Sequence, residues 1–120
     1  MYYVSKRLEI AGAHHLNLNY ESKCNNLHGH NWIVVVHCKS EKLNENGMVT
    51  DFAIIKKMIS EKFDHQYFNK IPPFDSMNPT AENMAREFCN MIPNCYKVEV
   101  QESEGNVAVY ERDEPNNKVF

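Results

Sequence analysis

Apolar and polar residues alternate along residues 2–10, and this alternation predicts the first β-strand. One face carries the apolar side chains together with a single lysine: Tyr2, Val4, Lys6, Leu8 and Ile10. Since side chains two residues apart point the same way in a strand, the same face continues to His14. The turn-rich residues 17–27 are expected to form a loop, and residues 28–38 a second strand with apolar groups on both faces.

Two amphipathic helices are expected between residues 50 and 92. Thr50 and Asp51 open the first, whose apolar positions follow helical spacing: Phe52, Ile55, Ile59 and Phe63. Thr80 is a candidate N-cap of the second, whose apolar positions are Ala81, Met84, Ala85, Phe88 and Ile92. Alternation returns at residues 96–102, followed by a turn and a last strand at residues 107–110.

The element order ββααββ predicts a single α+β domain over residues 1–120. Two antiparallel hairpins are expected to form a four-stranded sheet, with both helices on one face. The other face of the sheet is then uncovered, although the second strand is apolar on both faces, and open sheet edges invite further pairing. We therefore expect several subunits to close a larger barrel together as a homo-oligomer.

Composition and charge exclude several functional classes. A net charge of −3 argues against a surface for nucleic acid or an anionic membrane, because both need clustered positive charge. No apolar run approaches the roughly 18 residues of a membrane helix, and the N-terminus lacks a signal-peptide pattern, so a cytoplasmic protein is expected. The four glycines are too dispersed for a dinucleotide loop, a phosphate loop or a hydrolase nucleophile elbow.

Four of the six histidines lie within residues 14–30. His28 and His30 flank Gly29 in the second predicted strand, so both imidazoles face one side, and the hairpin can bring His14 opposite them. Three neutral imidazoles with one open position are typical of a catalytic zinc site. The alternative is that these histidines are polar residues at strand ends.

Cys24 and the pair Asp64 and His65 are candidates for acid–base chemistry. Cys24 lies in the predicted loop, four residues before His28, in polar surroundings. Thiol, imidazole and carboxylate together are the pattern of an activated cysteine. The alternative for Cys24 is a small, buried hydrophobic residue, and the alternative for Asp64 and His65 is a pair that caps the end of the first helix. Sequence alone does not show whether Cys24 and His65 meet.

Two glutamates complete the set of candidate residues. Glu102 is the last in-phase residue of an otherwise apolar strand face. It is either exposed at the strand end or placed to accept two parallel N–H groups from a bound heterocycle. Glu82, at the start of the second predicted helix, most simply complements the helix dipole.

Together with residues 78–83 (NPTAEN), these residues resemble the 6-pyruvoyltetrahydropterin synthase family. The resemblance extends from the first strand to Tyr110. It is strongest to the bacterial branch, the 6-carboxy-5,6,7,8-tetrahydropterin synthases of queuosine biosynthesis. Cys24 and His28 enclose three residues, as in that branch, whereas the animal enzymes have a longer insertion before the HGH sequence.

The resemblance implies the tunnelling fold, in which trimers close a twelve-stranded barrel and stack as hexamers, with active sites between subunits. It also assigns residues to roles. These are the zinc ligands His14, His28 and His30, the catalytic set Cys24, Asp64 and His65, and the substrate-binding residues Glu102, Thr80 and Glu82, with Glu102 as the anchor of the pterin ring.

The implied substrate is 7,8-dihydroneopterin triphosphate, and the bacterial branch releases triphosphate and acetaldehyde to give 6-carboxytetrahydropterin. One alternative is a 6-pyruvoyltetrahydropterin synthase, which eliminates triphosphate but keeps the side chain. Another is a zinc-containing, pterin-binding module without catalysis. The presence of Cys24, Asp64 and His65 argues against the second alternative.

Overall fold

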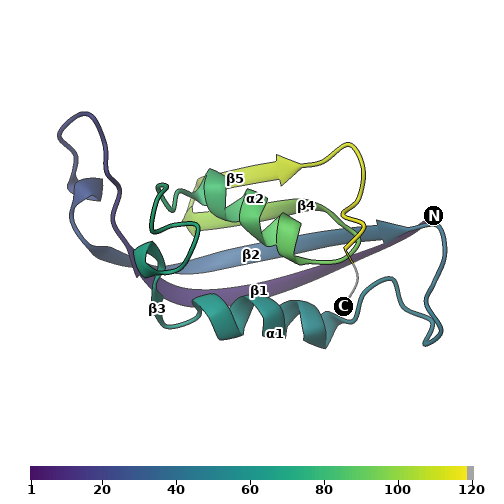
Figure 1. Cartoon of the computed structure of the whole chain (residues 1–120). Coiled ribbons are helices and arrows are strands. Elements are labelled where there is room, and N and C mark those ends of the chain that lie inside the picture. The colour runs from purple at the N-terminus through teal and green to yellow at the C-terminus, as the bar shows by residue number, and fades with distance from the viewer. Residues whose placement is uncertain (119–120) are drawn as a thin grey trace.

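A computed structural model describes residues 1–118 of the chain. Its elements follow the predicted order, with additional short segments (Figure 1). The strands are β1 (Tyr2–His14), β2 (His28–Ser40), β3 (Gln66–Tyr67), β4 (Cys95–Ser103) and β5 (Asn106–Glu111), the helices are α1 (Phe52–Phe63) and α2 (Ala81–Met91), and the 3-10 helices are η1 (Lys23–Asn25) and η2 (Phe68–Lys70).

The two predicted hairpins are confirmed. β1 pairs antiparallel with β2 over its whole length, from Tyr2 opposite Ser40 to His14 opposite His28. β4 and β5 form the second hairpin, and β4 also pairs antiparallel with β2. Figure 1 shows the chain between β1 and β2, which contains η1, projecting beyond the end of the sheet.

The expectation of a four-stranded, wholly antiparallel sheet is wrong. The sheet has five strands in the order β3-β1-β2-β4-β5, and β3 pairs parallel with β1. The reason lies in the segment after α1, where the backbone of Ala11 forms hydrogen bonds with Asp64 and His65, the two residues directly before β3. Its N–H donates to Asp64 Oδ1 over 2.9 Å, and its carbonyl accepts from the His65 N–H over 2.6 Å. A strand of two residues is too short to produce an alternating pattern.

Both helices begin at the residues that the sequence predicted. The Asp51 side chain accepts a hydrogen bond from the Ala53 N–H and caps α1. Thr80 Oγ1 accepts from the Asn83 N–H over 3.1 Å and caps α2. Such caps satisfy N–H groups that have no partner within the helix.

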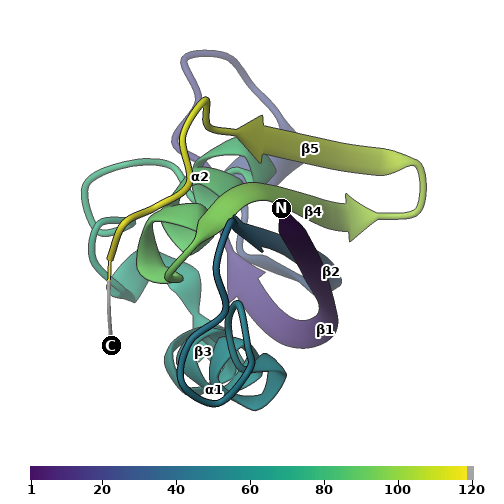
Figure 2. The same cartoon turned by 90° about the vertical axis from the view of Figure 1, so that its right-hand side faces the viewer.

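One face of the sheet packs against both helices and forms the core. Most of the apolar face predicted for β1 and β2 is buried there, although Tyr2 at the start of β1 is 51% exposed. α1 lies against β1, while α2 lies against β4 and β5 (Figure 2). On the opposite face, Ile33 and Val35 are only half-buried. None of the helices in the described residues has the length and apolar character that a membrane span requires.

Candidate functional site

The three candidate metal ligands lie together where β1 ends and β2 begins. His14 is opposite His28 in the hairpin, and Gly12 is opposite His30. The strand alternation therefore places all three imidazoles on the face that packs against the helices, as the phase of the sequence predicted. Trp32, the next residue on this face of β2, is fully buried and packs edge-on against the rings of His14 and His30.

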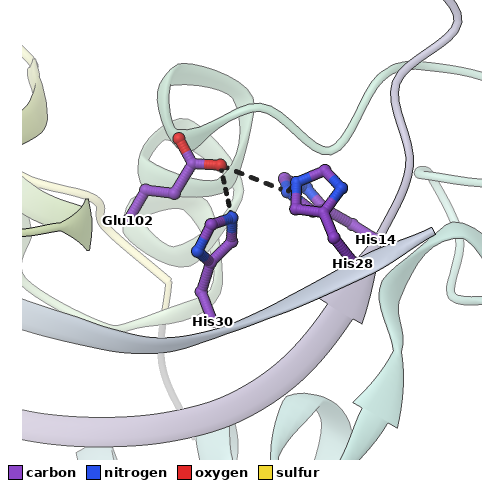
Figure 3. A group of neighbouring side chains, drawn as sticks. All are labelled: His14, His28, His30 and Glu102. Atoms are coloured by element: carbon purple, nitrogen blue, oxygen red, sulfur yellow. Dashed lines mark hydrogen bonds and ion pairs between the residues drawn. The ribbon is translucent and has the colours of Figure 1, made fainter. Parts of the chain in front are cut away.

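The Nε2 atoms of the three histidines point toward one another, and Glu102 from β4 reaches the same place (Figure 3). His14 Nε2 lies 3.0 Å from His28 Nε2. Glu102 Oε1 lies 3.2 Å from His14 Nε2 and 3.0 Å from His30 Nε2. One potential ligand atom from each of these residues lies within 4.8 Å of the others.

Backbone carbonyls hold the outer nitrogens of two of the rings. Nδ1 of His14 lies 2.8 Å from the carbonyl oxygen of Pro79, and Nδ1 of His28 lies 2.7 Å from that of Asn26. Because a carbonyl only accepts, each Nδ1 carries the proton, and each neutral ring keeps a lone pair on Nε2. This is the usual outer-shell arrangement of metal-binding histidines.

His14 is the most deeply buried of the three histidines, with 1% of its surface exposed. Burial holds the pKa of His14 below its ordinary value, and the hydrogen bond to Pro79 opposes this shift. A lowered pKa keeps the imidazole neutral near pH 7, which is the form that binds metal.

These nitrogens fit a bound cation. In the tautomers that the two carbonyls select, the Nε2 lone pairs of His14 and His28 lie 3.0 Å apart, and a cation bound by both nitrogens would remove the repulsion between them. His30 Nε2 is covered and, within the described part of the chain, has no hydrogen-bond partner, since Glu102 approaches without hydrogen-bond geometry. Ligands about 2.0–2.1 Å from a tetrahedral zinc are roughly 3.3 Å apart, which is close to the 3.0 Å between His14 Nε2 and His28 Nε2.

Glu102 also lines an open cleft of about 370 Å³ between the start of α2 and the β4–β5 hairpin. The exposed Glu82 borders the same cleft. Thr80 directly precedes Ala81, which lines the cleft, and the Thr80 hydroxyl caps α2. The cleft therefore has two carboxylates on its walls, one of which also reaches the histidine cluster.

Asp64 and His65 contact each other at the end of α1. Asp64 Oδ1 lies 3.1 Å from His65 Nδ1, and the imidazole of His65 is 81% exposed. His65 has a φ of 60°, in the left-handed region that non-glycine residues seldom adopt and that is often found at functional sites. Its ring borders a second, shallow depression together with Tyr67 and Gly29, whereas Glu82 and Glu102 border the first.

Cys24 lies in η1, within the projecting segment between β1 and β2. Its side chain is half-buried, whereas the three other cysteines, Cys38, Cys89 and Cys95, are buried. Among the residues that the structure describes, no hydrogen bond joins Cys24 to Asp64 or His65. The chain thus gathers the histidines and pairs Asp64 with His65, but it does not bring Cys24 to that pair.

Sequence reasoning missed two features of this site. The carbonyls of Pro79 and Asn26 carry no signal, because backbone groups are the same in every residue. The approach of Glu102 to the histidines depends on the β2–β4 register, in which Gln101 is opposite Ile33. Alternation within one strand does not specify which residue lies across from it.

Comparison with known proteins supports the resemblance described from the sequence. The family described as "6-pyruvoyl tetrahydropterin synthase" matches residues 3–113. The chain belongs to this family. The resemblance that the sequence predicted is therefore confirmed over almost the whole length.

Relatives from bacteria and animals have similar sequence identities to this chain. A 6-carboxy-5,6,7,8-tetrahydropterin synthase from Synechocystis is 32% identical, covering 92% of this chain and 93% of the relative. The human 6-pyruvoyl tetrahydrobiopterin synthase is 33% identical and covers 89% of each chain. The structure of Caenorhabditis elegans 6-pyruvoyl tetrahydropterin synthase superposes with a TM-score of 0.73 at 27% identity, covering 92% of this chain and 94% of that one.

Proposed function

We propose that this chain is a zinc-dependent 6-carboxy-5,6,7,8-tetrahydropterin synthase of queuosine biosynthesis that works in the cytoplasm. It converts 7,8-dihydroneopterin triphosphate and water to 6-carboxytetrahydropterin, acetaldehyde and triphosphate. The observation that carries this proposal is the convergence of three imidazole Nε2 atoms beside a cleft with two carboxylates. The several bacterial relatives named 6-carboxy-5,6,7,8-tetrahydropterin synthase support the choice of reaction.

His14, His28 and His30 would hold the metal, with Pro79 and Asn26 fixing two of the rings from outside. When bound there, zinc supplies a Lewis acid that increases the acidity of hydroxyl groups on the substrate side chain. Three protein ligands leave an open position, as in other catalytic zinc sites. Glu102 Oε1, within 3.2 Å of two of the nitrogens, lies where the substrate would enter.

The substrate ring is proposed to occupy the cleft beside α2. A pterin presents an amino group and ring N–H groups along one edge, and a carboxylate accepts two such parallel donors. Glu102 and Glu82 provide carboxylates at this cleft, and Thr80 holds the start of α2 beside it. These three residues form the proposed substrate-binding set.

The proton transfers are assigned to Cys24, Asp64 and His65. Cys24, as a thiolate, would take a proton from the side-chain carbon next to the ring, and His65 would carry protons to and from the ring and hydroxyl groups. Asp64 orients the imidazole, since its Oδ1 lies 3.1 Å from His65 Nδ1. Because one chain does not join Cys24 to this pair, we propose that a second subunit completes the set.

Two surfaces support assembly into trimers that close a barrel and stack as hexamers. β5 is an edge strand, and its Val107 and Val109 are 53% and 54% exposed. The sheet face opposite the helices carries the half-buried Ile33 and Val35. Pairing of edge strands between subunits would remove open edges, and closing the sheets into a barrel would turn these exposed apolar side chains inward.

Product analysis tests the reaction most directly. Purified, zinc-loaded protein would be incubated with 7,8-dihydroneopterin triphosphate, and the products identified by mass spectrometry. Acetaldehyde and 6-carboxytetrahydropterin are expected. The similarity to the human enzyme favours one second candidate, a 6-pyruvoyl tetrahydropterin synthase; triphosphate release with an intact side chain and no acetaldehyde would select it. Pterin binding without turnover would indicate a non-catalytic module.

A further inference from the structure

The chain that leaves β1 is held by two asparagine side chains in place of a neighbouring strand. Asn69 Oδ1 accepts from the His15 N–H over 2.9 Å, and Asn69 Nδ2 donates to the His15 carbonyl over 2.9 Å. Asn78 repeats this pairing two residues later. Its Oδ1 accepts from the Asn17 N–H over 2.8 Å, and its Nδ2 donates to the Asn17 carbonyl over 3.2 Å.

The other side of the same segment bonds the candidate catalytic loop. The Leu16 N–H donates to the carbonyl of Cys24 over 2.8 Å. Residues 15–17 therefore form one short extended ladder, with Asn69 and Asn78 on one side and Cys24 on the other. This ladder directly follows the metal ligand His14.

Asn78 has a connection to the metal cluster that Asn69 lacks. It directly precedes Pro79, whose carbonyl lies 2.8 Å from His14 Nδ1. The Asn78 carbonyl also accepts from Asn83 Nδ2 over 2.9 Å, which ties the segment to the first turn of α2. The Asn78 carboxamide thus connects two parts of the site. It holds Asn17, three residues after His14, against the residue that precedes Pro79, whose carbonyl contacts the His14 imidazole.

We propose that Asn78 is a positioning residue for the metal centre. By pairing with the Asn17 backbone, it locks the Pro79 carbonyl against His14 Nδ1, which fixes both the ring orientation and the tautomer that leaves Nε2 free. Groups in the outer shell of a metal site act in this way, and losing one typically lowers metal affinity by about 10–100-fold. The proposal rests on the metal site of the proposed function.

The test compares asparagine-to-alanine variants of the full-length protein. Asn78→Ala is expected to raise the Zn²⁺ dissociation constant, measured by chelator competition, by about 10–100-fold, and to change the absorption spectrum of the Co²⁺ form. Asn69→Ala is the matched control, because it removes an equivalent pair from the same segment without touching the chain before Pro79. It is expected to change Zn²⁺ affinity much less.

A second control separates positioning from general loss of stability. The buried Asn116 donates through Nδ2 to the carbonyls of Cys89, Asn90 and Ile92, far from the histidines in sequence. Asn116→Ala is expected to lower the unfolding temperature of the metal-free protein while leaving Zn²⁺ affinity unchanged. Should Asn78→Ala not yield folded protein, Asn78→Asp keeps the acceptor for the Asn17 N–H, removes the donor, and is expected to weaken Zn²⁺ binding as well.

The outcomes are distinguishable. Equal Zn²⁺ affinity in the wild type and Asn78→Ala would overturn the positioning role and leave the metal site intact. Equal losses in Asn69→Ala and Asn78→Ala would also overturn it, because the effect would then come from the ladder and not from Pro79. A wild-type protein that binds no Zn²⁺ would overturn the proposed function itself.

Discussion

The histidine cluster and the acid–base residues differ in how far one chain determines their geometry. The cluster stands on two strands that pair residue by residue, and backbone carbonyls fix two of its rings. Cys24 instead lies in a projecting segment, and the exposed His65 follows a helix at another place in the fold. Regular strand pairing therefore sets the geometry of the histidine cluster, whereas loops set the positions of the proposed acid–base residues.

This difference predicts that metal binding and turnover depend on different parts of the molecule. Metal binding depends on contacts within one subunit and should survive changes to the acid–base residues. In the proposed oligomer, turnover would depend on acid–base residues from two neighbouring subunits. Four experiments can break or sharpen this division.

The largest effect is expected from removing a ligand. His28→Ala should lose most of the bound zinc, because it removes one of the three imidazole nitrogens that converge on the site. Elemental analysis of purified protein measures the metal content. His37→Ala is the matched control, since His37 pairs with Glu99 over 2.6 Å, outside the cluster. Full zinc occupancy in His28→Ala would remove this residue from the ligand set.

Cys24→Ala should lower turnover by about a hundredfold or more, the usual scale for losing an acid–base group. Its zinc content and oligomeric state should equal those of the wild type, because no ligand changes. Steady-state kinetics with elemental analysis and light scattering measure all three. Unchanged turnover would exclude Cys24 from the mechanism, and loss of zinc would contradict the separation of the two regions.

Mixed oligomers test whether the acid–base set spans two subunits. Cys24→Ala and His65→Ala proteins should each be inactive alone. Co-expressed in equal amounts, they should recover activity in about a quarter of the sites if subunits mix at random across a heterologous interface. Activity per site is measured after purification through two different tags. No recovery in confirmed mixed oligomers would mean that one subunit supplies both residues.

The smallest effect concerns the rigidity of the hairpin beneath the cluster. A Cβ at Gly12 would overlap the ring of the buried Phe68, so Gly12→Ala should destabilise the fold by about 1–3 kcal/mol through overpacking. Gly29→Ala is the matched control on the paired strand, where the nearest atom to a new Cβ is the Gly12 carbonyl oxygen at 3.4 Å. Denaturant unfolding compares the two, and equal stabilities would show that this packing is not tight.

The sequence predicted the features that depend on local periodicity and capping. Alternation placed β1, and the apolar residues on both faces placed β2. The two-residue repeat of strand side chains then placed His14, His28 and His30 on one face. The same logic located the capping residues Asp51 and Thr80. Each of these features depends on neighbours a few positions away in the chain.

Features that depend on distant contacts were not predictable in the same way. β3 exists because Ala11 bonds residues 64 and 65, which no local pattern records. The C-terminal segment also has a structural role that the sequence did not indicate, since the buried Asn116 bonds three carbonyls after and within α2. The contact between Glu102 and the histidines depends on the register of β4 against β2.

X-ray absorption at the zinc edge of the loaded protein tests the central claim most directly, because it reports the atoms that surround the metal. Three imidazole nitrogens at about 2.0–2.1 Å, with any further ligand an oxygen, are the result we predict. A sulfur neighbour at about 2.3 Å would show that a cysteine binds the metal, and it would contradict the assignment of His14, His28 and His30 as the protein ligands.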